Sequence, residues 1–240
     1  MAGLISAARR AMHPSHMHIK NWPAELRPRE RLISQGPGKL TDAELLAIFL
    51  GSGVRGEDAV VTSRNLLQEA GKLRGLLERG AREMTSLPGL GPARACKLSA
   101  VLELNKRHLW AGLERGAALK NATDAGEYFS ARLRPHKQEV FAVLFLDNQH
   151  RAVAFEELFS GTINSAQIHP REVVRRALAH NAAAIIIGHN HPSGHPQPSA
   201  ADRSLTEEVQ KALRMVDIRL LDHFVVGDGS PVSMASLGWL

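Results

Sequence analysis

An apolar run in the second half of the chain constrains the fold more than any other feature of the sequence. The residues AAAIIIG at 182–188 have the length and composition of one buried β-strand. Stretches with the helical spacing of apolar residues lie on both sides of this run, at 169–181 and at 199–217. A helix, a buried strand and a second helix in succession predict a sheet covered by helices.

Three more strands are expected in the same half of the chain. The runs EVFAVLFLD (139–147) and RAVAFEELFSG (151–161) have strand composition on either side of an Asn-Gln turn. The run IRLLDHFVVGDG (218–229) predicts the last strand. The second half therefore belongs to the α/β class, with a mixed sheet flanked by helices.

In the first half of the chain, the apolar residues have the spacing of helices instead. Helices are expected at residues 40–50, 58–71, 73–83 and 87–109. Thr41 and Glu44 form a capping-box pattern at the start of the first helix, and Gly71 closes the second. Pro92 suits the first turn of the last helix.

Three regions of different character are expected along the chain. In residues 1–21 the apolar residues do not recur at the spacing of a helix or a strand, and this region is expected to be disordered. Residues 22–118 are expected to form the helical domain, which ends in a Gly- and Ala-rich linker at 111–121. Residues 119–240 are expected to form the α/β domain.

The composition excludes several classes of protein. Apolar residues make up 44% of the 240 residues, which is ordinary for a globular protein with a core. No apolar run reaches eighteen residues, and the first residues lack the apolar core of a signal peptide, so neither a membrane span nor secretion is expected. The single cysteine, Cys96, excludes an internal disulfide and fits a cytoplasmic protein.

Charge is distributed unevenly between the two halves. Residues 1–120 carry 19 basic and 11 acidic side chains, whereas residues 121–240 carry 11 and 13. The basic first half predicts contact with a polyanion, although charged side chains at a solvated surface explain the counts equally well. Aromatic residues make up only 5% of the chain, which argues against a surface on which single-stranded bases stack.

The segment LPGLGPARA resembles the hairpin of a helix-hairpin-helix module. Gly89 and Gly91 allow a tight turn whose N–H groups can approach a phosphate, and Lys97 adds positive charge. Such contacts predict DNA binding that does not depend on base sequence. The alternatives are a tight turn between packed helices and a module that binds protein.

A candidate metal site follows the apolar run. His189 and His191 project from one face of the expected strand, because side chains alternate along a strand. Asp202 lies in the first turn of the next helix. Two nitrogens and one carboxylate oxygen suit a catalytic zinc ion, whose fourth position stays open for water. Ser199 and Asp202 alone would be interpreted as a capping box.

The spacing His189-x-His191, seven residues, Ser199, two residues, Asp202 resembles the JAMM (MPN+) metallopeptidase motif. Asn190 departs from the Ser or Thr that many JAMM proteins have between the histidines. The phrases HNHPSG, HPREVVRRAL and LLDHFVVGD are similar to the bacterial RadC family in particular. The resemblance extends to NWPAELRPRERL and LTDAELLAIFLGSG, and so covers nearly all of the chain after about residue 20.

The resemblance implies roles for the residues of this motif. His189, His191 and Asp202 would be zinc ligands, and Ser199 would help to hold the tetrahedral intermediate. His195 lies in the same loop and could replace a ligand, but it breaks the motif spacing. Other histidines, at 169, 180 and 223, are expected to be structural or to face solvent.

The family also uses a glutamate on an early strand as general base. The candidates are Glu139, Glu156, Glu157 and Glu172. We favour Glu139, since it opens the run EVFAVLFLD, where the glutamate of the family lies. It would take a proton from the attacking water and pass it to the leaving amine.

The function implied by this resemblance is zinc-dependent hydrolysis of a peptide or isopeptide bond, with a DNA contact through the basic half. An alternative is a DNA-associated accessory protein for repair or recombination, whose zinc site is structural or idle. A deaminase would need a P-C-x-x-C pair, which a chain with one cysteine lacks. A nuclease would be expected to hold magnesium with oxygen ligands rather than with histidines.

Overall fold

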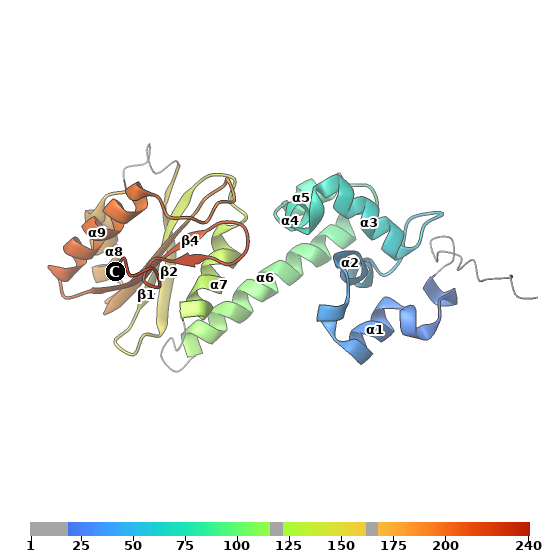
Figure 1. Cartoon of the computed structure of the whole chain (residues 1–240), viewed down its shortest axis with the longest axis horizontal. Helices are drawn as coiled ribbons and strands as arrows, with labels where there is room; N and C mark the ends of the chain where they lie inside the picture. Colours follow the sequence, from blue (N-terminus) through green and yellow to red (C-terminus); the bar gives the residue numbers. More distant parts are fainter. Residues whose placement is uncertain (1–18, 116–121, 162–167) are drawn as a thin grey trace, which may run out of the picture. The chain divides into compact units, whose positions relative to one another are not determined.

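The computed structural model describes residues 19–115, 122–161 and 168–240 (Figure 1). Most of the predicted disordered region and the second half of the predicted linker therefore lie outside the described residues. The chain divides into two compact units, one up to Ala100 and one from Val101 onward. No helix in the described ranges is both long enough and apolar enough to cross a membrane.

The first unit is helical, as the spacing of its apolar residues predicts. It contains the 3₁₀ turns η2 (Ile19–Asn21), η3 (Ala24–Leu26) and η4 (Pro37–Lys39), the helices α1 (Pro28–Gln35), α2 (Asp42–Leu50), α3 (Ala59–Ala70), α4 (Lys72–Leu77) and α5 (Ala81–Met84), and the start of α6 (Pro92–Arg115). The predicted capping box of α2 is present, with Thr41 and Glu44 bonded reciprocally. Asp58 caps α3, and Gly71 ends it in the left-handed conformation.

The helix α6 is longer than its sequence pattern indicates. It continues to Arg115 and includes the start of the segment predicted to be a linker. Three apolar side chains near the end of α6 pack in the core of the second unit: Leu109, Trp110 and Leu113. This packing stabilises the helix although its last residues include Gly and Ala.

The second unit is built on one mixed sheet. Its elements are α7 (Ala122–Leu133), β1 (Val140–Leu146), β2 (Ala152–Ser160), α8 (Pro170–Ala179), β3 (Ala184–Asn190), α9 (Ala200–Arg214), β4 (Arg219–Val226) and β5 (Val232–Ser233). The strand order is β2-β1-β3-β4-β5. Only β3 and β4 are parallel, and α9 connects them. The predicted mixed α/β class is confirmed; α7 and the two-residue β5 were not predicted.

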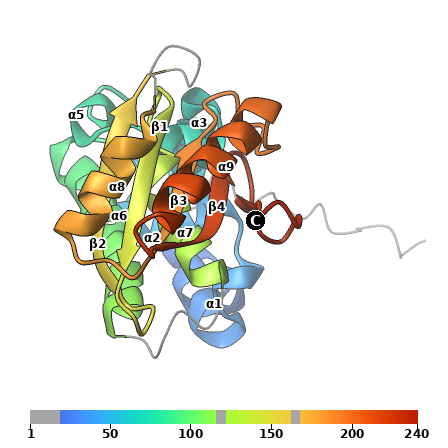
Figure 2. The same cartoon turned by 90° about the vertical axis from the view of Figure 1, so that its left-hand side faces the viewer.

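Helices cover both faces of this sheet. Figure 2 shows α8 and α9 side by side over one face, where they pack on apolar side chains of β1 and β3. On the other face, α7 packs against β3 and β4. Every residue of β1 and β3 is buried, which explains why these two strands are almost continuously apolar in sequence.

One glycine in β3 allows α7 to lie close to the sheet. A Cβ atom at Gly188 would lie 2.6 Å from Cδ1 of Phe129, a fully buried ring on α7. The next residue along β3 is His189. The contact between α7 and the sheet therefore lies directly beside His189, the first histidine of the candidate site.

We predict that Gly188→Ala lowers the free energy of unfolding by about 1–3 kcal/mol, because the added methyl group must displace Phe129 in a packed core. Gly112→Ala is the matched control, since Gly112 is a helical residue with open space around its Cα. That substitution should be neutral or stabilise by up to about 1 kcal/mol. Urea unfolding of both variants measures the difference, and equal stabilities would contradict the packing argument.

Candidate metal centre

The end of β3 and the start of β1 bring the predicted site residues together. Phe141 on β1 is paired with His189 on β3, so Glu139 lies beside the two histidines. The Nε2 atoms of His189 and His191 are 3.0 Å apart. Oε1 of Glu139 lies 4.0 Å from Nε2 of His189. Glu139, His189 and His191 thus form a group in which one ligand atom from each lies within 4.8 Å of the others.

Asp202 enters the same site from the first turn of α9. Ser199 is the N-cap of this helix, and both its N–H and its hydroxyl donate to Oδ2 of Asp202, at 2.6 and 2.7 Å. The other oxygen, Oδ1, lies 3.2 Å from Nε2 of His189. It is buried and makes no hydrogen bond within the described part of the chain.

The environment of Asp202 favours the ionised carboxylate. Burial by itself raises the pKa of this fully buried group. The adjacent ring of His189 and the two donors of Ser199 outweigh burial and hold the pKa of Asp202 well below its usual range. The site therefore contains a charged oxygen with a free lone pair directed toward the histidines.

A buried chain of hydrogen bonds orients His189. The hydroxyl of Thr206 donates to the carbonyl oxygen of Asp202 at 2.6 Å, so it can accept from Nδ1 of His223, also at 2.6 Å. Nε2 of His223 then accepts from Nδ1 of His189 at 2.8 Å. These assignments follow from the donors and acceptors of the network. They leave Nε2 of His189 outside this chain of hydrogen bonds and facing the site.

His223 is fully buried, and burial, together with the adjacent imidazole of His189, lowers its pKa well below the usual value. A neutral imidazole is what the chain of hydrogen bonds requires. From the sequence alone, His223 was expected to be structural or to face solvent, with no role in the site. The signal that could have identified it is a histidine within the mostly apolar strand IRLLDHFVV, because a buried histidine needs partners for its ring nitrogens.

His191 is oriented by the loop that follows it. Its Nδ1 lies 2.7 Å from the carbonyl oxygen of His195, so Nδ1 donates and Nε2 keeps its lone pair. The side chain of His195 is exposed. Close backbone packing fixes the loop, since a Cβ at Gly227 would lie 2.5 Å from the carbonyl oxygen of Gly194.

The residues present fit a zinc ion. Four-coordinate zinc with bonds of about 2.0–2.1 Å places neighbouring ligand atoms about 3.3 Å apart. The observed spacings are 3.0 Å between the two Nε2 atoms and 3.2 Å from Nε2 of His189 to Oδ1 of Asp202. Each of the three atoms has a lone pair available for a cation. Such a set of two imidazoles and one carboxylate matches those of catalytic zinc sites.

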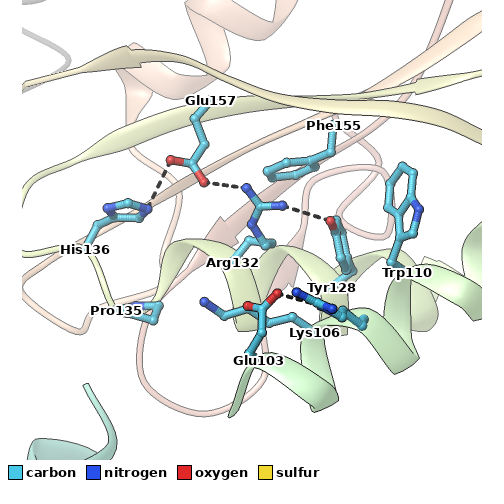
Figure 3. Close-up of a pocket in the computed structure, with 10 residues that line it drawn as sticks. Glu103, Lys106, Trp110, Tyr128, Arg132, Pro135, His136, Phe155 and Glu157 are labelled. Atoms are coloured by element: carbon cyan, nitrogen blue, oxygen red, sulfur yellow. Dashed lines mark hydrogen bonds and ion pairs between the residues drawn. The ribbon is translucent and has the colours of Figure 1, made fainter. Parts of the chain in front are cut away.

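Of the four candidate glutamates, only Glu139 lies at this site. Glu156 pairs with His180 at 2.7 Å, and Glu172 pairs with two arginines of its own helix. Glu157 faces a groove of about 600 Å³ on the face of the sheet that α7 covers (Figure 3).

The groove offers no clear recognition site for a ligand, because several of its charged side chains bond to one another. The guanidinium of Arg132 stacks on Phe155 and bonds to Tyr128 and Glu157, each at 3.0 Å, and His136 lies 3.2 Å from Glu157 (Figure 3). Arg132, Glu157 and His136 are therefore paired with one another.

The predicted DNA-contacting residues lie on the turn before α6 and on its first turns. Gly89 has φ +79°, and a Cβ there would press on Thr62 and Val54, so the fold itself requires this glycine. Gly91 has open space around its Cα, and Lys97 is exposed. Arg94 donates to the carbonyl oxygens of Gly89 and Ser52, each at 2.7 Å, and so holds the turn.

Comparison with known proteins gives matches over both units. A family model described as a RadC-like JAB domain matches residues 119–239, and one described as the UPF0758 N-terminal domain matches residues 19–96. A UPF0758 protein of Xanthomonas campestris (strain 8004) is 64% identical over 224 residues, which are 93% of this chain and 100% of the relative. UPF0758 proteins of Xanthomonas oryzae (strain PXO99A) and Xylella fastidiosa (strain 9a5c) are 65% and 63% identical with the same coverage.

We predict that His189→Ala, His191→Ala and Asp202→Ala each abolish stoichiometric zinc binding, because each removes one of three protein donors. His195→Ala is the matched control. It should retain zinc, since only its backbone carbonyl contacts His191. Elemental analysis of the purified variants measures the metal content. Stoichiometric zinc in the Asp202→Ala protein would contradict the assignment of the third ligand.

Proposed function

Because this chain belongs to the UPF0758 family and carries its RadC-like JAB domain, we propose that it is a zinc-dependent hydrolase of peptide or isopeptide bonds. The sequence-based assignment to the RadC family is confirmed by these matches. One observation carries the proposal: two histidine nitrogens and the unbonded oxygen of Asp202 converge, with the carboxylate of Glu139 beside them.

The residues of the chain divide the work of hydrolysis in this proposal. Zinc bound at this site would polarise the substrate carbonyl and acidify a water molecule. Glu139 would accept a proton from the attacking water and deliver it to the leaving amine. It is suited to this task because it lies near the histidines and is 14% exposed, so that water can reach it.

Ser199 has two roles in the proposal. In the structure its hydroxyl donates to Oδ2 of Asp202, which holds the carboxylate with Oδ1 toward the histidines. To stabilise the tetrahedral intermediate, the same hydroxyl must rotate and donate to the substrate oxygen.

We predict that Glu139→Gln retains zinc and a folded structure but loses hydrolysis by at least about 100-fold, because the amide cannot accept a proton. Glu156→Gln is the matched control, since that glutamate pairs with His180 away from the site. A mass-spectrometric screen of peptide and isopeptide cleavage, with and without chelator, measures the effect. Full activity in Glu139→Gln would place the base elsewhere.

The same screen separates the two functional classes. Chelator-sensitive cleavage supports the hydrolase. A wild-type protein that binds stoichiometric zinc and cleaves nothing supports the alternative, a DNA-associated accessory protein with a structural or idle zinc site.

We also propose that the basic half contacts DNA without reading base sequence. The support is its excess of positive charge and the exposed residues Pro88, Gly91 and Lys97 in and after the turn before α6. Phosphate contacts made by backbone N–H groups and lysines fix position and carry no sequence information.

For the full-length protein, the logarithm of duplex affinity should fall linearly with the logarithm of salt concentration. Lys97→Glu should weaken binding to all sequences alike and reduce the slope by about 1, because one phosphate contact is lost. Lys211→Glu, at an exposed position of α9 in the acidic half, is the charge-matched control and should have no effect. Fluorescence anisotropy measures both. Absence of duplex binding by the wild type near physiological salt would contradict the proposal.

A further inference from the structure

Asn190 lies between the two histidines of the metal centre, and its side chain points away from them into the protein. The residue is 2% exposed. Its Oδ1 accepts a hydrogen bond from the N–H of Val140 at 2.8 Å. Its Nδ2 donates to the carbonyl oxygens of Gln138 at 3.0 Å and His136 at 3.2 Å. One buried amide therefore makes three bonds to the segment that carries Glu139.

These bonds fix the backbone on both sides of Glu139. The peptide unit between Glu139 and Val140 is held at both of its polar groups: its carbonyl accepts from Gly161 N–H at 2.9 Å, and its N–H donates to Asn190. The peptide unit after Gln138 is held through its carbonyl by the same amide. With both flanking units held, the Cα of Glu139 has a defined position and direction.

The bonds replace a sheet ladder that ends at this point. The last paired residues of β1 and β3 are Phe141 and His189. Beyond that pair, the side chain of Asn190 takes over the contact with the incoming segment. It connects the strand that carries the histidines to the residue next to Glu139, with no other residue in between.

Two other side-chain contacts, made by this segment and by the residues just before it, are more exposed. The ring of His136 reaches Glu157 at the rim of the groove, where its side chain is 37% exposed (Figure 3). Arg134 donates to the carbonyl oxygen of Gly227 at 3.1 Å, in a half-buried contact. Exposed pairs of this kind contribute little, whereas a buried amide must keep its partners.

Only an asparagine has the groups that this position uses. The site requires one acceptor and two donors on a short side chain, which is the inventory of a primary amide. Aspartate of the same shape retains the acceptor but has no N–H for the two carbonyls. Leucine of similar volume has neither.

We propose that Asn190 is a positioning residue that fixes Glu139 relative to the two histidines. The part of this inference that concerns catalysis rests on the proposed function, in which Glu139 is the general base. The part that concerns the segment 136–140 rests on the hydrogen bonds alone.

The test uses the full-length protein with and without zinc. Asn190→Asp and Asn190→Leu should remain folded and bind stoichiometric zinc, because the three ligands are unchanged. Hydrogen exchange of peptides covering residues 136–141, followed by mass spectrometry, should be faster in both variants. If the wild type cleaves a peptide, kcat should fall by about 10- to 100-fold with KM nearly unchanged, since a displacement of about 1 Å costs up to about 100-fold.

His136→Ala is the matched control. It removes the ring that contacts Glu157 but keeps the carbonyl that accepts from Asn190, so exchange and kcat should stay near the wild-type values.

Three results would overturn the proposal: wild-type exchange and kcat in Asn190→Leu, loss of zinc in both variants at position 190, or an equal effect of His136→Ala. A wild type that cleaves nothing contradicts the proposed function instead. In that case the exchange data still decide whether Asn190 holds the segment.

Discussion

The capping box at the start of α9 is the interaction on which the metal centre depends. Both donors of Ser199 bond to one oxygen of Asp202, which leaves the second oxygen directed toward the histidines. A buried ionised carboxylate requires a positive partner. One turn later on the same helix, Thr206 bonds the backbone of Asp202 and orients His223, which in turn orients His189. The first two turns of α9 thus determine both the oxygen and one of the nitrogens of the site.

Local patterns in the sequence were sufficient for much of this architecture. The strand β3, the flanking helices α8 and α9, and the capping boxes at Thr41 and Ser199 are all specified by residues within a few positions of each other. The spacing of His189, His191 and Asp202 is also local, because a strand, a short loop and one helical turn suffice to bring them together. Such features depend little on the rest of the fold.

The parts that were not predicted depend on contacts between distant segments. His223 contacts His189 only because β4 pairs in parallel with β3. Asn190 contacts Val140 only because β1 pairs antiparallel with β3. Neither pairing can be read from the spacing of residues. The helix α7 was missed because Gly126 lowers the helix propensity of this segment, which also follows a Gly- and Ala-rich stretch. Tertiary packing of Phe129 and Leu133 outweighs that weak propensity.

The position of the proposed ligands along the chain has a consequence for the order of assembly. All three proposed ligands lie between His189 and Asp202, within one strand–loop–helix unit, whereas Glu139 lies about fifty residues earlier in the sequence. A folding intermediate in which β3 and α9 had formed would already contain the three proposed donors for the cation. Glu139, the proposed base, would join only when β1 docks, so early binding of metal would stabilise the folding domain before it acquires any capacity for chemistry.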